Sequence, residues 1–361
     1  MKSSAGQWIL RVTLPVDPVY KTASEVATLK LVASYTSLPV PPVAAYWDGT
    51  DSDSSADKSL GLEWIIMGKL PGITLSDAWT DIDLDMKIGI VESIADKLHE
   101  LYECKEARFS ALGNIYGKQE LQKPSLSEAP YSIGRIVSMA FFWDQRLQQP
   151  VNRGPFSSSA EWLTSRLQLV EQECNDILES DQTDSDDKKD AEYFKSTVQR
   201  LTKQMKFFCQ PLEENIFVLH HDDLNSHNIL IDPVSGALTG ILDWECVSAV
   251  PIWKSCQLPH FLANEWTRDV KPALGEYQEA DGSVSSLYPE HLKEWEVTVL
   301  AEYFLKRMES KNSDWINVYR SSERIRDFDF AIKNCDNLFM ASKIVKWLDV
   351  LENNEPYKRL V

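Results

Sequence analysis

The polar residues in the stretch 217–245 have the types and the spacing that chemistry requires. The stretch reads FVLHHDDLNSHNILIDPVSGALTGILDWE, in which three apolar runs alternate with polar residues. His221, Asp223 and Asn228 fit the pattern H-x-D-x-x-x-x-N, and Asp243 follows the third apolar run. The runs predict short strands that carry these polar side chains at their ends.

Phosphoryl transfer is the chemistry that needs this set of residues. A carboxylate must lie beside the attacking hydroxyl, while an amide oxygen and a second carboxylate hold Mg²⁺ on the nucleotide phosphates. Asp223 and Asn228 share one tight loop, and a hairpin-like return brings Asp243 alongside them. Such oxygen ligands suit Mg²⁺, which takes only one or two protein ligands.

The stretch resembles the catalytic and metal loops of the aminoglycoside phosphotransferase-like family, which is related to choline kinases and protein kinases. The family commonly carries H-G-D-L-x-x-x-N and then I-D-W, where this chain has HHDDLNSHN and LDW. The resemblance implies that Asp223 is the catalytic base and that His221 braces the loop. It also implies that Asn228 and Asp243 are metal ligands. Residues 153–163, RGPFSSSAEWL, resemble a segment of fungal members that leads into a helix capped by a serine.

Two residues depart from the family pattern. Asp222 stands where a glycine is common, and Glu245 stands where a glycine often follows the tryptophan. A second carboxylate beside the base would disfavour the ionised form of the base; alternatively, Asp222 points to solvent. A zinc site that uses His220, His221 and His227 is disfavoured, because no cysteine pair or H-E-x-x-H spacing accompanies them.

Near the N-terminus, residues 8–13 predict a strand on which Arg11 is the only basic residue. The resemblance implies that Arg11 reaches the nucleotide phosphates, for which a guanidinium is suited. Alternatively, Arg11 lies in solvent at a strand edge. A helix is predicted from about residue 22 to residue 35. Its Glu25 either completes a capping box with Thr22 or pairs with Arg11.

The next apolar strand, residues 62–67, is expected to lead from the small lobe to the large one. The resemblance places the adenine against backbone groups after this strand and implies a further contact from the second run of the catalytic stretch. The residues implied are Met67, Gly68, Lys69 and Leu230. The alternative is an ordinary strand end followed by a turn at residues 71–72.

Together these features predict an α+β, two-lobed, protein-kinase-like fold. The expected lobes are a partial, N-terminally shortened sheet lobe at residues 1–70 and a large helical lobe at residues 71–361. A kinase-like small lobe would begin with two strands joined by a Gly-rich loop, and no such loop precedes Trp8. Three explanations stay open: the protein is longer at its N-terminus, it covers ATP in another way, or it binds nucleotide poorly.

Other segments of the large lobe are predicted from their periodicity and turn residues. Helices are expected near residues 84–102, 131–153, 290–310 and 325–350, and two more in residues 153–177 and 194–208. Residues 113–118, GNIYGK, predict a turn. The acid-rich residues 179–190 predict a solvated loop.

Composition limits the kind of partner. The net charge of −18 argues against binding to nucleic acid or to an anionic membrane, and it favours a cationic substrate or serves solubility alone. The six cysteines show no C-x-x-C pair, so we expect free thiols in a reducing compartment. No signal peptide or membrane-spanning run is evident, and a cytoplasmic location is expected.

The sequence therefore predicts an ATP- and Mg²⁺-dependent phosphotransferase that moves a γ-phosphoryl group to a hydroxyl of a small molecule. The alternative is a pseudokinase or interaction module with the same fold and little or no transfer. The acceptor and the oligomeric state are not indicated by any motif.

Overall fold

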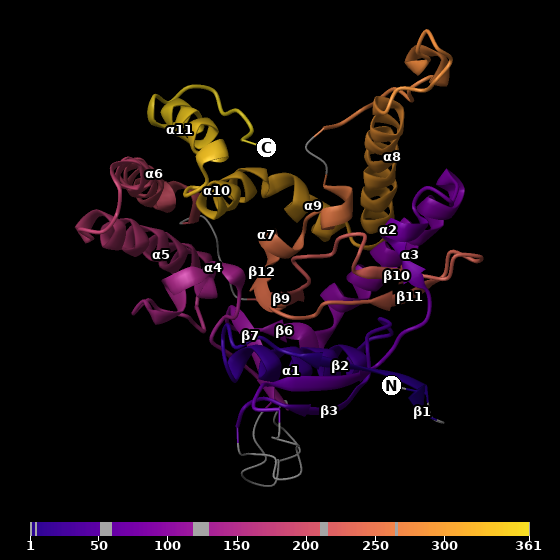
Figure 1. Ribbon diagram of the computed structural model, residues 1–361, viewed down its shortest axis with the longest axis horizontal. Helices are drawn as coiled ribbons and strands as arrows, with labels where there is room; N and C mark the ends of the chain where they lie inside the picture. Colours follow the sequence, from indigo (N-terminus) through magenta and orange to yellow (C-terminus); the bar gives the residue numbers. More distant parts are fainter. Residues whose placement is uncertain are drawn as a thin grey trace.

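A small antiparallel sheet lies beneath a larger, mostly helical part (Figure 1). The computed structural model describes residues 2–3, 6–50, 60–117, 130–209, 216–263 and 266–360. The architecture is thus the predicted α+β arrangement with a small sheet lobe. The boundary expected at residue 70 stays a prediction.

The sheet of the small lobe has four strands in the order β1-β2-β4-β3. They span Lys2–Ser3 (β1), Gly6–Val12 (β2), Val43–Trp47 (β3) and Trp64–Gly68 (β4). Helix α1 (Tyr20–Tyr35) packs against β3 and β4 and also against β7 of the larger part. The strands expected at residues 8–13 and 62–67 are therefore confirmed, as β2 and β4. The register places Arg11 opposite Ile65.

A three-stranded sheet, in the order β11-β10-β5, connects the small lobe to the catalytic stretch. It consists of Ile73–Thr74 (β5), Ile229–Ile231 (β10) and Leu238–Ile241 (β11), and the short helix α2 (Leu75–Ala78) follows β5 directly. The chain that leaves the small lobe thus pairs with the strand that follows the catalytic loop.

Gly72 makes this junction possible. Its φ is +104°, and a Cβ atom there would lie 2.5 Å from both the Ile231 carbonyl oxygen and Thr239 Oγ1. We expect Gly72→Ala to lower the free energy of unfolding by about 2 kcal/mol, through backbone strain and steric overlap. Chemical denaturation measures this. Gly89→Ala, at a helical glycine with open space around it, should leave stability equal or higher, and an unaffected Gly72→Ala variant would contradict the account.

A third sheet carries the start of the catalytic stretch, in the order β6-β9-β12-β7-β8. Its strands are Arg108–Phe109 (β6), Gly113–Gly117 (β7), Tyr131–Gly134 (β8), Phe217–His220 (β9) and Ser248–Pro251 (β12). The turn predicted at residues 113–118 was wrong for 113–117, and Lys118 lies outside the described residues. Gly113 serves close strand approach instead: a Cβ there would lie 2.1 Å from the Gly134 carbonyl oxygen.

The helix predicted over residues 131–153 was also largely wrong. β8 occupies its start, and only one short helix, α4 (Met139–Phe142), and a 3₁₀ turn at Asp144–Gln148 follow. Pairing with β7 decides the conformation here, because tertiary contacts override local propensity.

The acid-rich run splits between a turn and a helix. α5 (Ser159–Glu179) begins as expected at a serine cap, where the Ser158 side chain accepts a hydrogen bond from the Glu161 amide. The loop predicted over 179–190 ends early, because α6 (Ser185–Cys209) starts within it. The Asp184 carboxylate accepts from the amides of Asp186 and Asp187, and acidic residues favour the positive end of a helix dipole.

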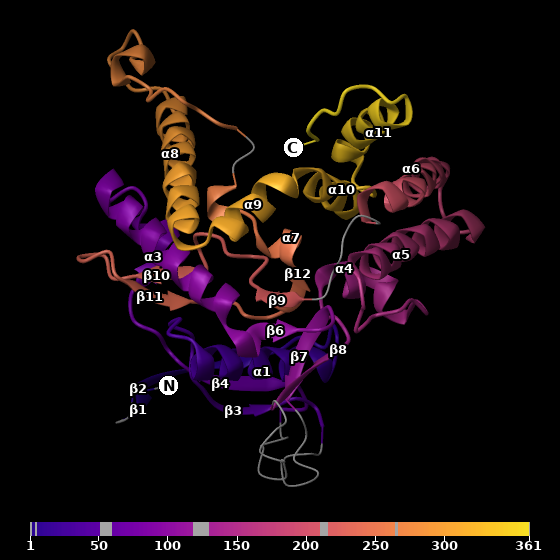
Figure 2. The same cartoon turned by 180° about the vertical axis from the view of Figure 1, so that it is seen from behind.

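The remaining helices complete the larger part. α3 (Leu84–Glu103) lies beside α8 (Leu287–Lys311), and α5 lies beside α6, in both views (Figures 1 and 2). The other helices are α7 (Ile252–Ser255), α9 (Ser313–Ser321), α10 (Glu323–Lys333) and α11 (Leu338–Glu352), with 3₁₀ turns at Lys105–Ala107, His260–Leu262 and Leu274–Tyr277. None of the six cysteines forms a disulfide. Among the described helices, none combines the length and hydropathy needed to cross a bilayer.

Candidate active site

The loop between β9 and β10 holds the predicted catalytic carboxylate. The Asp223 side chain is 59% exposed. Asn225 Nδ2 donates to Asp223 Oδ1 at 3.0 Å, and Asn228 Nδ2 donates to the Asp223 carbonyl oxygen at 2.9 Å. The side-chain nitrogen of Asn228, Nδ2, thus fixes the loop. The Asn228 Oδ1 atom receives no hydrogen bond from the described residues, so it can act as an oxygen ligand.

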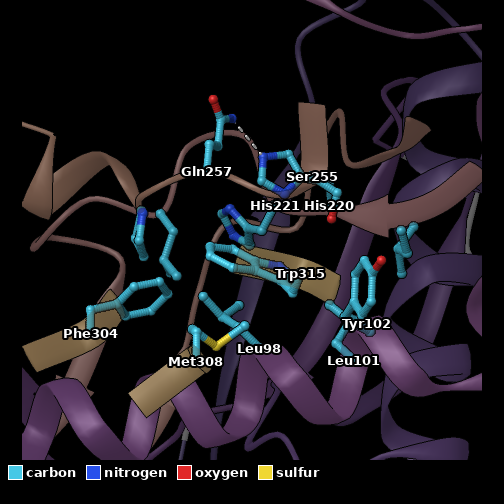
Figure 3. Close-up of a pocket in the computed structure, with 13 residues that line it drawn as sticks. Leu98, Leu101, Tyr102, His220, His221, Ser255, Gln257, Phe304, Met308 and Trp315 are labelled. Carbon is cyan, nitrogen blue, oxygen red and sulfur yellow. Dashed lines mark hydrogen bonds between the residues drawn. The ribbon is translucent and has the colours of Figure 1, made fainter. Parts of the chain in front are cut away.

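His221 lies beneath this loop. Its Nε2 donates to the Leu242 carbonyl oxygen at 2.9 Å, and its ring meets the edge of Trp244 at 5.0 Å between centroids. Burial lowers the pKa of His221. A neutral, hydrogen-bonded imidazole between the two loops has the geometry expected of a brace. His221 also lines a small cavity with Tyr102 and Trp315 (Figure 3). That cavity measures about 30 Å³, about the volume of one water molecule, and excludes a substrate.

Asp243 follows β11 in an unusual backbone conformation. Its φ is 62°, in the left-handed region that non-glycine residues rarely adopt, and such strain concentrates at functional sites. The Leu242 amide donates to the Asn228 carbonyl oxygen at 2.8 Å, so Asp243 comes next to Asn228. Burial, and then the nearby Glu245, raises the pKa of Asp243. A cation here would relieve this penalty.

The oxygen ligands that could hold a divalent cation are therefore Asn228 Oδ1 and the Asp243 carboxylate. In the described ranges no cluster of three or more His, Cys, Asp or Glu side chains forms a metal site of its own. Two oxygen ligands are the number that Mg²⁺ takes from a protein while it keeps several waters.

Arg11 lies over the same site. It forms an ion pair with Glu25, and its guanidinium lies 3.0 Å from Glu245 and 3.7 Å from Asp243. The interpretation that Arg11 lies in solvent was therefore wrong, and so was the capping box. Helix α1 begins at Tyr20 without a side-chain cap, and Glu25 faces Arg11 instead. Burial raises the pKa of Glu25 to about 7 against the opposing effect of Arg11.

The expected adenine site lies at the end of β4. The Gly68 amide donates to the Pro42 carbonyl oxygen and the Lys69 amide to the Gln7 carbonyl oxygen, each at 2.9 Å. Met67 and Leu230 are buried. Two of the backbone N–H groups expected to contact the adenine, those of Gly68 and Lys69, thus already donate hydrogen bonds within the small lobe. The nucleotide contacts of Met67, Gly68, Lys69 and Leu230 stay predictions.

Sequence reasoning did not identify the series of linked ion pairs that begins at Asp222. Lys254 Nζ lies 3.1 Å from Asp222 and 3.0 Å from the buried Asp329, which also pairs with Arg166. The Lys254 ammonium holds the pKa of Asp222 well below its usual range. Asp222 therefore stays ionised and anchored, rather than only pointing to solvent. The other residues of this series lie on α7, α10 and α5, distant from Asp222 in sequence, so no local motif predicts the ion pairs.

Two other residues near the loop were missed as well. His260 Nδ1 lies 3.3 Å from Asp223 Oδ1, and Lys21 Nζ lies 2.9 Å from Glu245. Lys21 falls one helical turn before Glu25, so it shares a face of α1 with it. That spacing was a usable signal, whereas a histidine after a proline in an irregular segment was not.

His220 makes stability depend on pH. Burial lowers its pKa to about 4, and Gln257 Nε2 lies 3.1 Å from His220 Nε2. The unfolded histidine, with a pKa near 6.5, binds more protons than the folded one, so stability falls as pH drops through this window. We expect about 2 kcal/mol to be lost between pH 6.5 and 5. Denaturation at several pH values, with His220→Gln showing a flatter profile, checks this; parallel profiles would contradict it.

Comparison with known proteins identifies the family of the chain. Residues 2–292 match the model of the phosphotransferase enzyme family (APH). The chain therefore belongs to that family. Two subtelomeric hrmA-associated cluster proteins from two strains of Aspergillus fumigatus are each 25% identical over 297 residues, which cover 70% of this chain and 55% of theirs. The chain thus spans about half the length of these curated relatives.

Solved structures with similar folds include two phosphotransferases and a kinase. The streptomycin–ATP complex of APH(2'')-IIa has a TM-score of 0.48 at 12% identity, over 95% of this chain and 84% of that one. ADP-bound APH(2'')-Ib has a TM-score of 0.47 at 12% identity, over 95% and 85%. A Plasmodium vivax ethanolamine kinase has a TM-score of 0.37 at 14% identity, over 88% and 74%.

Proposed function

We propose that the chain transfers the γ-phosphoryl group of ATP to a hydroxyl of a small molecule. The observation that carries the proposal is the convergence of Asp223, Asn228 and Asp243 through the hydrogen bonds from Asn228 Nδ2 and from the Leu242 amide. Membership of a phosphotransferase family supports it. These are the kinds of group that phosphoryl transfer requires.

Asp223 would orient the acceptor hydroxyl and receive its proton. Its carboxylate is exposed, so an acceptor can reach it, and Asn225 and His260 hold Oδ1 in place. Asn228 and Asp243 would hold Mg²⁺, which neutralises charge on the transferring phosphates when it is bound. Positioning by the loop and these fixed charges would supply most of the rate.

Arg11 and Lys21 would meet the phosphates of the nucleotide. Both cations already contact Glu245, at 3.0 and 2.9 Å. Phosphate oxygens would compete with this carboxylate for the same two cations. The adenine would lie against the backbone of residues 67–69, where carbonyl groups are the available partners if the present sheet pairing is kept.

Glu245→Gln should therefore tighten MgATP binding by about fivefold. The change removes one negative charge beside the phosphates and frees two cations from partly buried ion pairs, which are each worth about 1 kcal/mol. Calorimetric titration measures the dissociation constant. Glu302→Gln, at an exposed surface pair with Lys306, is the matched control and should change nothing. Weaker binding in Glu245→Gln would show that Glu245 supports the site instead.

A pseudokinase or interaction module is the second candidate. The pairing of Arg11 and Lys21 with Glu245, and the hydrogen bonds that the Gly68 and Lys69 amides already donate, favour it, because these groups are then not available to a nucleotide. Phosphorus NMR separates the candidates. A phosphotransferase incubated with MgATP and a pool of alcohols yields ADP and a new phosphomonoester resonance, whereas a pseudokinase leaves the ATP resonances unchanged.

A further inference from the structure

A second and much larger hollow adjoins the catalytic loop. Its volume is about 620 Å³, which is in the range of pockets that bind small molecules. It lies between α2, the catalytic loop, the 3₁₀ turn at His260–Leu262 and the first turns of α8. Figure 1 shows α2 and α8 on the same side of the molecule. None of the residues implied for the nucleotide lines it.

This hollow is lined by residues that contact the predicted base. Asn225 and His260 both line it, and both contact Asp223 Oδ1, at 3.0 and 3.3 Å. Ser226 of the same loop lines it as well. A molecule bound in the hollow can therefore present a hydroxyl to Asp223. The hollow is therefore a candidate site for a phosphoryl acceptor.

The two buried charged side chains that line the hollow, Lys87 and Glu296, already neutralise each other. Lys87 Nζ donates to Glu296 Oε2 at 2.7 Å, and Trp79 Nε1 donates to the same oxygen at 3.0 Å. Lys87, Trp79 and Glu296 are all at most 9% exposed. A buried carboxylate with two such donors has little remaining attraction for a cationic ligand.

The charges at the mouth are balanced too. Glu290 and Lys293 are exposed on α8, and neither forms an ion pair with any of the described residues. The lining residues thus contain two lysines and two glutamates, whose formal charges sum to zero. The charge of −18 on the whole chain is therefore not concentrated at this hollow.

The rest of the wall is mainly apolar. Trp79, Ile82, Phe261 and Leu292 face the hollow, with hydroxyl groups from Ser76 and Thr80 beside them. A ligand that carries several ammonium groups would lose hydration here without gaining matching carboxylates. An aromatic or branched apolar body would bury its surface against this wall.

We propose that the acceptor is an alcohol of low net charge with an aromatic or branched apolar body, and not a polyamine. This rests on the proposed function, because the hollow is identified through Asp223. It specifies the acceptor class, which neither the family match nor the acidity of the chain provides.

The test is phosphoryl transfer from MgATP to a matched series of acceptors. 2-Phenylethanol, phenylalaninol and 3-phenyllactate share a phenyl ring and an aliphatic hydroxyl but carry charges of zero, plus one and minus one. Gentamicin serves as the polycation. We expect kcat/KM for at least one phenyl compound to exceed that for gentamicin tenfold or more. MgATP binding is measured in parallel on the same protein.

Two variants on α8 test the location. Leu292→Glu places a charge in the apolar wall and should lower kcat/KM for the phenyl acceptor at least tenfold while MgATP binding is unchanged. Leu287→Glu, at an exposed position of the same helix that does not line the hollow, should have no effect. Equal kcat/KM values for the two variants would overturn the location.

The outcomes separate this inference from the proposed function. Preferred transfer to gentamicin would contradict the proposal of a low-charge acceptor but would still support the proposed phosphotransferase function. MgATP binding without transfer to any acceptor would overturn both. Transfer to a phenyl compound that Leu292→Glu abolishes supports both.

Discussion

Asp223→Asn should lower the rate of phosphoryl transfer by about a thousandfold, which is within the range of general-base contributions. The amide has nearly the same shape and can still accept the hydrogen bond from Asn225 that holds Asp223 Oδ1. It cannot accept the proton of the acceptor hydroxyl. The loss should therefore be in kcat, with the affinity for MgATP changed less than about threefold and the melting temperature nearly unchanged.

Asp232→Asn is the matched control for this change. Asp232 lies in the turn after β10, where its side chain accepts from the amides of Val234 and Ser235. The substitution keeps an acceptor in that turn, so turnover should be unaffected. Single-turnover kinetics with radiolabelled ATP measures both variants. Transfer retained by Asp223→Asn at more than a tenth of the parent rate would remove Asp223 from the role of base.

Lys254→Met should destabilise the protein by about 4 kcal/mol. The change leaves Asp329 buried with only Arg166 as partner and removes the cation that anchors Asp222 beside the base. Burial opposes the ionisation of Asp329, and Lys254 and Arg166 together outweigh it, so its pKa is lowered. Removing one partner from a buried ion cluster typically costs a few kcal/mol. Chemical denaturation gives the value.

A double-mutant cycle distinguishes the network from simple loss of packing. Lys254→Met combined with Asp222→Asn should be less destabilising than the sum of the two single changes, because their partners are then removed together. Lys306→Met, at an exposed pair with Glu302, should cost less than about 0.5 kcal/mol. Additive single changes would show that Lys254 and Asp222 are not coupled, and that the catalytic loop is held by other contacts.

The catalytic stretch could be predicted because its chemistry is local in sequence. A single loop and one hairpin-like return place Asp223, Asn228 and Asp243 together, and short apolar runs on either side specify the strands. The pairing of Arg11 with Glu25 could be foreseen as one of two alternatives. The structure decides between them, since α1 starts two residues before Thr22 and directs Glu25 toward the sheet.

What could not be predicted depends on partners that are distant in sequence. The anchoring of Asp222 needs α5, α7 and α10 to meet, and no spacing encodes that meeting. β7 and β8 form because they pair with each other. From the sequence alone, residues 113–118 resemble a turn because of their glycines, and residues 131–153 resemble a helix, but tertiary pairing overrides these local signals. The balanced charges of the acceptor hollow likewise come from α3 and α8 together.

Calorimetric titration with MgATP, on the parent chain and on Asp243→Ala, tests the central claim most directly. Asp243 is the carboxylate with a left-handed backbone beside Asn228 that the proposed function assigns to the metal. We predict binding by the parent that weakens at least tenfold in the variant and that also weakens when Mg²⁺ is removed with EDTA. Equal MgATP affinity in the two proteins, or no binding to the parent, would contradict the account.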